Sequence, residues 1–140
     1  MRIVIDSTVL IDALAKREPW SKDVEDIFLM VANHIIEAYI SPSSIADIYY
    51  LTEKCTHDEK VTRDVLNKIL SLFHVLTISK TDYIEALASP IEDYEDAIVE
   101  YAARKIGVGY IVTHKEDGLE PGIIPAVSPR LFIELVEDNE

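Results

Sequence analysis

The sequence predicts an α/β fold in which a mostly parallel sheet is covered by helices on both faces. Two observations lead to this prediction. Short apolar runs, typical of buried strands, alternate along the chain with longer segments whose apolar residues recur at helical spacing. Such alternation produces parallel sheets, whose strands are joined by helices that pack on the two faces. The length of 140 residues fits one domain over residues 1–140, and a hydrophobic fraction of 49% can form its core.

The first part of the chain is predicted to contain two strands, each followed by a helix. Arg2–Asp6 is an apolar, β-branched run that ends at an acidic residue, and Ser7 or Thr8 can cap the short helix after it. Apolar residues at helical spacing predict a longer helix over Pro19–Ile36. A second short strand, Ala38–Ser41, ends at the hydroxyl cap of another helix, whose first turn accommodates the proline that follows.

The rest of the chain continues the alternation. Ser79 is predicted to cap a short helix that runs to Leu87. Gly107 is predicted to end a later helix, which runs to Ile106. The predicted elements are a helix over His57–Phe73, a strand over His74–Ile78, a short helix from Ser79 to Leu87, a helix over Asp93–Ile106, strands over Gly109–Thr113 and Ile123–Val127, and a last helix from Ser128 and Pro129 onward.

The charge and the cysteine count exclude several classes of protein. With 26 acidic and 13 basic side chains, the formal net charge is −13. This excludes a broad basic face for nucleic acid, because phosphate contacts need Lys and Arg. A single Cys55 excludes an internal disulfide and a cysteine metal cage, and suits a reducing cytoplasm. No signal-peptide segment is present, and the longest uncharged run, Ile69–Ser79, is too short to span a membrane. We therefore expect a cytoplasmic domain without a membrane partner.

Several common catalytic motifs are missing. No glycine precedes Gly107, so neither a dinucleotide fingerprint nor a phosphate-binding loop can follow the first strand. The four histidines lack the spacing of metal ligands, and no serine lies in a nucleophile-elbow motif. The residues left to carry chemistry are carboxylates.

Acidic residues follow several of the predicted strands, and ligands of parallel sheets bind at the carboxyl ends of strands. Asp6 ends the first strand, Asp47 lies in the helix after the second, Asp93–Asp96 begins a helix, and Asp117 follows the fourth strand. Taken alone, each acid also fits helix capping, a solvated face or a surface loop. Carboxylates at one edge repel unless a cation neutralises them, and Mg²⁺ or Mn²⁺ suits such oxygen ligands. The pattern favours metal-assisted hydrolysis of a phosphodiester.

Several segments, in order along the whole chain, resemble the motifs of PIN domains, in particular the VapC-like ribonucleases of toxin–antitoxin pairs. These segments are Ile3–Asp12, Ile40–Tyr50, Asp93–Ile98, Tyr110–Thr113 and Ser128–Phe132. The resemblance implies a three-layer α/β/α sandwich around a central, mostly parallel sheet of four to five strands. It also implies an endoribonuclease that depends on Mg²⁺ or Mn²⁺ and is often the toxin of a toxin–antitoxin pair.

The resemblance also implies roles for individual residues. Ser7 and Thr113 match polar residues that orient the first acid and the attacking water, and Asp93 is either an outer partner of the site or only a helix cap. Carried over by position, the catalytic acids are Asp6, Asp47, Asp96 and Asp117, the metal ligands are Asp6, Asp96 and Asp117, and the supporting residues are Ser7, Thr113 and Asp93.

The chain departs from the family pattern at three positions. Thr8 stands where asparagine is usual after the first acid, and Lys115 stands where aspartate or asparagine is common. Gly118 follows Asp117 where many members have phenylalanine. Lys115 is therefore a candidate to contact a phosphate of the substrate or to replace charge near the metal.

Two other functions compete with the nuclease. The altered Thr8 and Lys115 positions and the acidic surface favour a PIN-like binding or regulatory module with weak or no catalysis. A phosphohydrolase with an aspartyl nucleophile is disfavoured, because it needs an aspartate where Thr8 stands. The resemblance implies RNA as substrate, with an antitoxin protein and a second copy of the chain, as a homodimer, as candidate partners. Tyr49 and Tyr50 fit either such an interface or the core.

Overall fold

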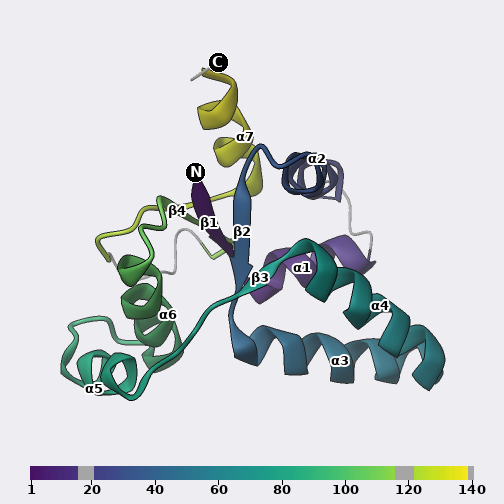
Figure 1. The fold of residues 1–140 in the computed structure, drawn as a ribbon, viewed down its shortest axis with the longest axis horizontal. Coiled ribbons are helices and arrows are strands. Elements are labelled where there is room, and N and C mark those ends of the chain that lie inside the picture. The colour runs from purple at the N-terminus through teal and green to yellow at the C-terminus, as the bar shows by residue number, and fades with distance from the viewer. Residues whose placement is uncertain (16–20, 116–121, 139–140) are drawn as a thin grey trace.

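The computed structural model describes residues 1–15, 21–115 and 122–138, and in this part of the chain it contains seven helices and one five-stranded sheet (Figure 1). The strands are β1 (Arg2–Ile5), β2 (Glu37–Ile40), β3 (His74–Val75), β4 (Tyr110–Val112) and β5 (Ala126–Val127), and the helices are α1 (Ser7–Ala15), α2 (Ser21–Ala32), α3 (Pro42–Thr56), α4 (Glu59–Leu72), α5 (Lys80–Ala88), α6 (Tyr94–Lys105) and α7 (Pro129–Asp138).

The sheet is parallel throughout, with the strand order β3-β2-β1-β4-β5. β1 lies at its centre, where Ile3 is in register with Ala38 of β2 on one side and with Tyr110 of β4 on the other. Ile3 and Ile5 are completely buried, as expected for a central strand whose two faces are covered. The predicted α/β fold with a parallel sheet is confirmed.

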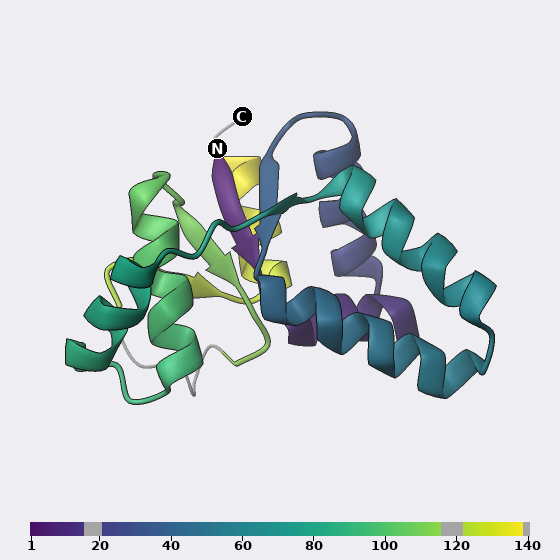
Figure 2. The same cartoon turned by 60° about the horizontal axis from the view of Figure 1, so that its bottom comes forward.

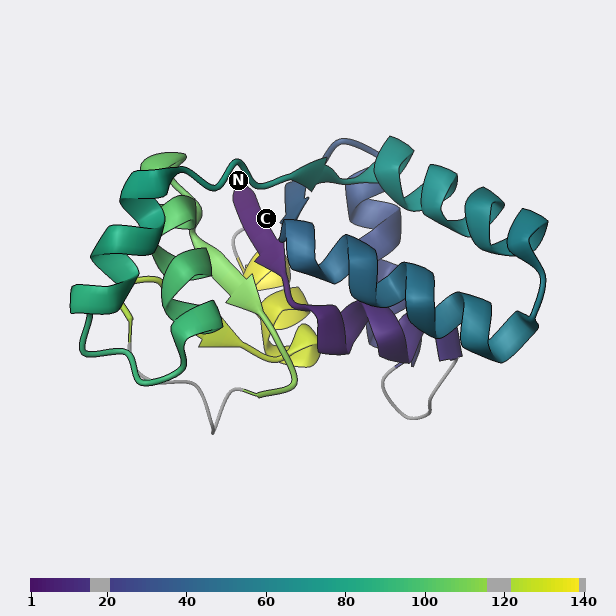
Figure 3. The same ribbon diagram turned by 90° about the horizontal axis from the view of Figure 1, so that it is seen from below.

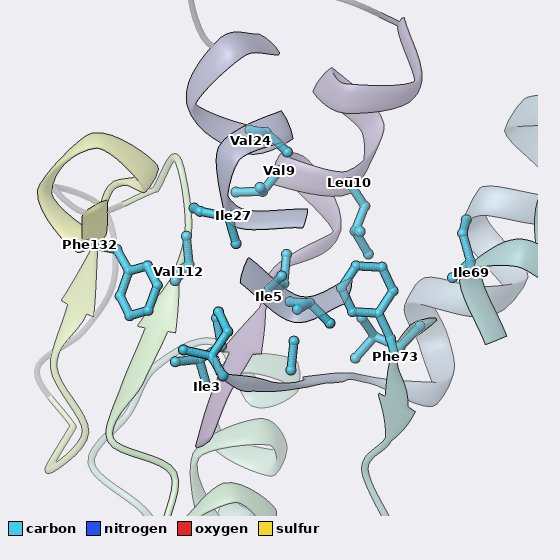
Figure 4. Close-up of a cluster of buried hydrophobic side chains, with 14 of the residues drawn as sticks. Ile3, Ile5, Val9, Leu10, Val24, Ile27, Ile69, Phe73, Val112 and Phe132 are labelled. Atoms are coloured by element: carbon cyan, nitrogen blue, oxygen red, sulfur yellow. The ribbon is translucent and has the colours of Figure 1, made fainter. Parts of the chain in front are cut away.

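Side chains alternate along β1 between two apolar layers, because successive residues of a strand point to opposite faces. Ile3 and Ile5 belong to the larger core, which also contains residues of α1, α2, α3, α4 and α7 (Figure 4). Val4 points to the other face and joins a smaller core with Ala103 of α6 and Leu76. Helices therefore cover both faces of the sheet, which gives the three-layer arrangement (Figure 2).

α3 and α4 form a pair of helices that extends away from the sheet (Figures 2 and 3). The inner ends of the pair are anchored by Ile48, Leu66 and Ile69, which are buried in the larger core. The amino end of α3 follows directly after β2, so this helix carries its first residues to the carboxyl edge of the sheet.

Two predicted helix boundaries differ from the structure, for the same reason. α2 ends at Ala32 and not at Ile36, because His34 adopts a left-handed conformation with φ 59°. The N–H group of His34 donates a hydrogen bond to the carbonyl oxygen of Val31, and that of Ile35 donates to the carbonyl oxygen of Met30. Helices that end in this way usually have glycine at the left-handed position, which His34 occupies here. His57, predicted to start a helix, has φ 51° and ends α3 instead.

α4 therefore begins at Glu59, where the side chain of Asp58 accepts the N–H groups of Lys60 and Val61. The third and fifth strands are also shorter than predicted, with two residues each. The segment before β5 contains Pro125, which has no N–H to donate to a neighbouring strand. The predicted start of the second helix, Pro19, lies outside the described residues.

Among the helices in the described residues, none combines the length and the apolar character that a membrane span needs.

Candidate functional site

A pocket of about 270 Å³ lies at the carboxyl edge of the sheet. Asp6 follows β1 and Ser41 follows β2 in its wall, while Lys115 comes from the segment after β4. The amino ends of α1, α3 and α6 complete the wall, and Figure 3 shows α1 and α3 starting directly after their strands. The polar residues of the wall are Asp6, Ser7, Ser41, Ser44, Asp47, Asp93, Glu95, Asp96 and Lys115.

The carboxylate of Asp6 is held by two hydroxyl groups, one from a residue two positions away and one from a residue 107 positions away. Thr8 Oγ1 donates to Asp6 Oδ2 at 2.6 Å, and Thr113 Oγ1 donates to the same oxygen at 3.0 Å. The N–H of Lys115 in turn donates to Thr113 Oγ1 at 3.0 Å. Both hydroxyl bonds end on Oδ2, so the described residues leave Oδ1 without a hydrogen bond. Asp6 is therefore oriented, with one oxygen available to a ligand.

Asp96 lies in the first turn of α6, beside the residue that caps this helix. Asp93 Oδ1 accepts the N–H of Asp96 at 2.9 Å, which satisfies a free donor of the first turn. Burial raises the pKa of Asp96, and the nearby charges of Asp93, Asp6 and Glu95 raise it further, whereas Lys115 opposes the shift. Burial and the neighbouring carboxylates thus both disfavour the ionised form of Asp96, a cost that a bound cation relieves.

Asp47 reaches the same pocket from α3, and its side chain is exposed. The predicted acids Asp6, Asp47 and Asp96 are thus brought together at one pocket from three separate elements. Asp93 and Ser7 also lie in its wall, and Thr113 touches it through its bond to Asp6. The predicted fourth acid, Asp117, and Gly118 after it lie outside the described residues.

Sequence reasoning missed two contacts at this pocket. The sequence identifies Thr8 as a candidate helix cap and as a departure from the family pattern, but not as a partner of Asp6, to which its hydroxyl makes the shorter of the two bonds. Glu95 was part of an acidic run, yet its Oε1 accepts a 2.7 Å bond from Ser43 Oγ, which lies 3.0 Å from Ser41 Oγ. A hydroxyl two residues after an acid is a signal for the first contact, because such groups often bond locally. The second joins residues 52 positions apart and has no local signal.

A second polar pair holds the segment after β4 against α1. His114 Nε2 lies 2.7 Å from Asp12 Oδ2, and both side chains are largely buried. His114 stands between Thr113, which bonds Asp6, and Lys115, which lines the pocket. The pair therefore fixes the backbone from which both of these side chains project.

The donor atoms of the pocket fit a hard cation, although they form an open set. Within residues 1–15, 21–115 and 122–138, no three Asp, Glu, His or Cys side chains lie close enough to enclose a metal ion. Mg²⁺ usually keeps several waters and is held by one or two carboxylates together with substrate phosphate. Asp6 and Asp96 can supply those carboxylates, since both line one pocket, where Asp93 and Glu95 add further negative charge.

We expect Asp96→Asn to stabilise the metal-free protein at neutral pH, on the order of 0.5 kcal/mol, the scale of substitutions outside a core. Because the pKa of Asp96 is raised in the fold, protonated Asp96 suits the fold better than ionised Asp96, and asparagine resembles the protonated form. The favourable contribution of the proton is complete below about pH 4 and is lost as the pH rises through the raised pKa. Thermal melts with a chelator should show the difference at pH 7 and none below about pH 4. A variant that is less stable at pH 7 contradicts the expectation.

Comparison with known proteins gives one family and several similar folds. The sequence profile of the PIN domain matches residues 2–117. VapBC2 from Rickettsia felis, bound to a DNA fragment from its promoter, aligns at 16% identity and a TM-score of 0.57, over 91% of this chain and 98% of that one. A toxin–antitoxin complex from Klebsiella pneumoniae aligns at 21% identity and a TM-score of 0.62, over 91% of this chain and 97% of that one. VapBC-1 from nontypeable Haemophilus influenzae aligns at 12% identity and a TM-score of 0.54, over 81% of this chain and 87% of that one. No curated protein matches the sequence. At these identities the structural likeness shows a shared fold.

Proposed function

This chain belongs to the PIN domain family, and we propose that it is an endoribonuclease that hydrolyses RNA phosphodiester bonds with Mg²⁺ or Mn²⁺. The observation that carries the proposal is the convergence of Asp6, Asp47 and Asp96, from three elements, on one pocket at the carboxyl edge of the sheet. The orientation of Asp6 by Thr8 and Thr113 supports it, because a fixed carboxylate is what a cation site requires.

Each side chain has a distinct part in this proposal. Asp6 and Asp96 hold the cation, Asp47 orients the attacking water from α3, and Asp117 is the proposed fourth acid. When bound, the cation supplies a lowered pKa for water and charge stabilisation at phosphorus. Ser7, Thr113 and Asp93 act as supporting residues around these acids, Thr113 through its bond to Asp6 Oδ2 and Asp93 through its bond to the Asp96 N–H.

The proposed partners follow from charge and from the neighbouring folds. One of the three similar structures is named a toxin–antitoxin complex, and we propose an antitoxin as the partner of this chain, with a homodimer as its oligomeric state. A net charge of −13 suits a partner with a basic surface, because complementary charge steers association. The proposal places the protein in the cytoplasm, where its RNA substrate is found. Co-expression with the product of the adjacent reading frame tests the partnership.

The direct test is cleavage of single-stranded RNA by the purified wild-type protein with Mg²⁺, with Mn²⁺ and with a chelator. We expect cleavage in the first two conditions only. Calorimetric titration with Mn²⁺ reports cation binding without relying on cleavage. Absence of cleavage of every RNA tried, together with absence of cation binding, contradicts the proposal.

Lys115 is expected to contribute to RNA binding through a phosphate contact. Its backbone is fixed by the N–H bond to Thr113, its ammonium lowers the pKa of Asp96, and the described residues offer it no ion pair within 4.0 Å. We expect Lys115→Ala to weaken binding of single-stranded RNA about tenfold, near 1.4 kcal/mol for a charge-assisted contact. The slope of log K against log salt should fall by about 0.7.

Lys68→Ala is the matched control, because this exposed lysine lies on α4 and does not line the pocket. Fluorescence anisotropy over a salt series measures both the affinity and the slope. Lys115→Ala with RNA cleavage and RNA binding equal to those of the wild type contradicts the phosphate contact.

A catalytically weak binding module is the second candidate function. It is favoured by the open arrangement of the acids, since the described residues contain no group of three that encloses a cation. A module of this kind is expected to bind RNA or a protein partner with no effect of Mg²⁺ or Mn²⁺. The cleavage and calorimetry experiments above separate the two functions.

A further inference from the structure

We propose that Tyr50 is a base-stacking residue, which contacts an unpaired base next to the carboxylate pocket and selects single-stranded RNA. This inference rests on the proposed nuclease function and adds to it the structural class of the substrate. Tyr50 belongs to none of the predicted catalytic or metal-binding positions, and the residue is 71% exposed.

Tyr50 lies on α3 about one turn beyond Asp47, just outside the residues that line the pocket. Asp47, which lines the pocket, precedes Tyr50 by three residues, so the two side chains share a face of the helix. Helical side chains lean toward the amino end of their helix, so the ring of Tyr50 covers the turn that holds Asp47. A base of an RNA strand bound in the pocket can therefore extend along α3 to this ring.

The ring is supported from behind by a neighbouring tyrosine. Tyr49 and Tyr50 contact each other edge to face, with ring centroids 5.7 Å apart and an interplanar angle of 88°. Tyr49 is half-buried and packs against the larger core, which fixes its own position. An exposed ring with such a support loses little conformational freedom when a base stacks on it.

The charge of the pocket makes a non-ionic contact with RNA necessary. Five carboxylates line the wall and Lys115 is its one cation among the described residues, so phosphate attraction there is weak before a metal binds. Stacking of a base on an aromatic ring does not depend on attraction to phosphate, and every base has a face that can stack. Bases in a duplex are already stacked on one another, so this contact favours single strands.

The surroundings of Tyr50 favour a base over a protein partner. The exposed residues on its side of α3 are polar or small, namely Ser43, Ala46, Asp47 and Lys54. Tyr50 is thus a single aromatic ring in a polar face, whereas protein interfaces are built around a contiguous apolar centre.

The experiment compares Tyr50→Ala, Tyr50→Phe and Tyr50→Trp, each in an Asp6→Asn background that suppresses cleavage. Binding of a labelled single-stranded RNA and of the same sequence as a duplex is measured by anisotropy with Mg²⁺ present. We expect Tyr50→Ala to weaken single-strand binding about 5- to 150-fold, the range for one stacked base, with little change for the duplex. Phenylalanine and tryptophan should keep the single-strand affinity within about twofold of tyrosine, since both retain an aromatic face.

Tyr83→Ala is the matched control, because this half-exposed tyrosine lies on α5, which contributes no residue to the pocket. Single-strand affinity that is the same in Tyr50→Ala as in the Asp6→Asn parent overturns the inference. A change of oligomeric state in Tyr50→Ala by light scattering, with RNA affinity unchanged, overturns it in favour of a protein contact. Failure of the nuclease proposal is distinct: the wild type then shows no metal-dependent cleavage, whatever the binding data show.

Discussion

Replacing Asp6 by asparagine is expected to lower Mg²⁺- or Mn²⁺-dependent RNA cleavage by at least about 100-fold, because even outer partners of a metal ligand are worth about 10- to 100-fold. Asp6 is the best-oriented of the three acids, held at Oδ2 by Thr8 and Thr113. Asparagine keeps an acceptor oxygen for these hydroxyl groups but removes the negative charge. The loss should therefore appear in cation affinity and in cleavage, with little change in the fold.

Initial rates of cleavage and Mn²⁺ titration by calorimetry measure the two effects, and a thermal melt checks the fold. Asp64→Asn is the matched control, since this exposed aspartate lies on α4 and does not line the pocket. It should leave both quantities unchanged. Cleavage by Asp6→Asn at the wild-type rate contradicts the proposed role of Asp6 and, with it, the proposed site.

The second large effect is expected for stability. Lys105→Met should lower the free energy of unfolding by about 3 kcal/mol, because it leaves the buried charge of Asp82 without its partner. Asp82 is 0% exposed, its Oδ2 accepts the N–H of Ser79 at 2.8 Å, and its Oδ1 pairs with Lys105 Nζ. The value is at the low end for buried pairs, since the side chain of Lys105 is 44% exposed.

The same pair predicts a dependence of stability on pH. Burial alone raises the pKa of Asp82, but the bonds from Lys105 and Ser79 outweigh burial and hold that pKa below its usual range. The stabilisation by the pair is therefore present above about pH 4 and is lost as the pH falls through the lowered pKa. The difference in stability between the wild type and Lys105→Met should shrink on acidification over that interval.

Urea unfolding at pH 7 and at lower pH measures both effects. Lys60→Met, an exposed lysine on α4, is the matched control and should cost little. The double variant Lys105→Met with Asp82→Asn should recover part of the loss, because no buried charge is then left unpaired. A loss below about 1 kcal/mol in Lys105→Met, the scale of a surface ion pair, contradicts the prediction.

Much of the fold was predictable because its periodicity is regular. Apolar β-branched runs alternate with helical segments, and this predicted the parallel sheet that the structure confirms. The errors fall where the backbone takes an uncommon conformation. His34 and His57 end helices in the left-handed region, a place where glycine is the usual signal, and the apolar spacing simply continued past them.

The candidate site was predictable to the extent that strand ends mark it. Asp6 is found by its place after β1, Asp47 by its helix after β2, and Asp96 by family resemblance. The contacts that hold these acids could not be predicted in the same way. Glu95 with Ser43 and Asp12 with His114 join positions far apart in sequence, and only the folded chain brings them together.

The bond between Thr113 and Asp6 has a consequence for synthesis of the protein. It spans 107 positions, and β4, which precedes Thr113, pairs directly with β1 at the centre of the sheet. Contacts of such separation form late, because the intervening chain must first be ordered. On a ribosome, β1 emerges first and cannot pair with β4 until most of the chain has been translated. A nascent or truncated chain that lacks β4 also lacks Thr113, so its Asp6 keeps only the local bond from Thr8, and we expect full cleavage activity only with nearly complete translation.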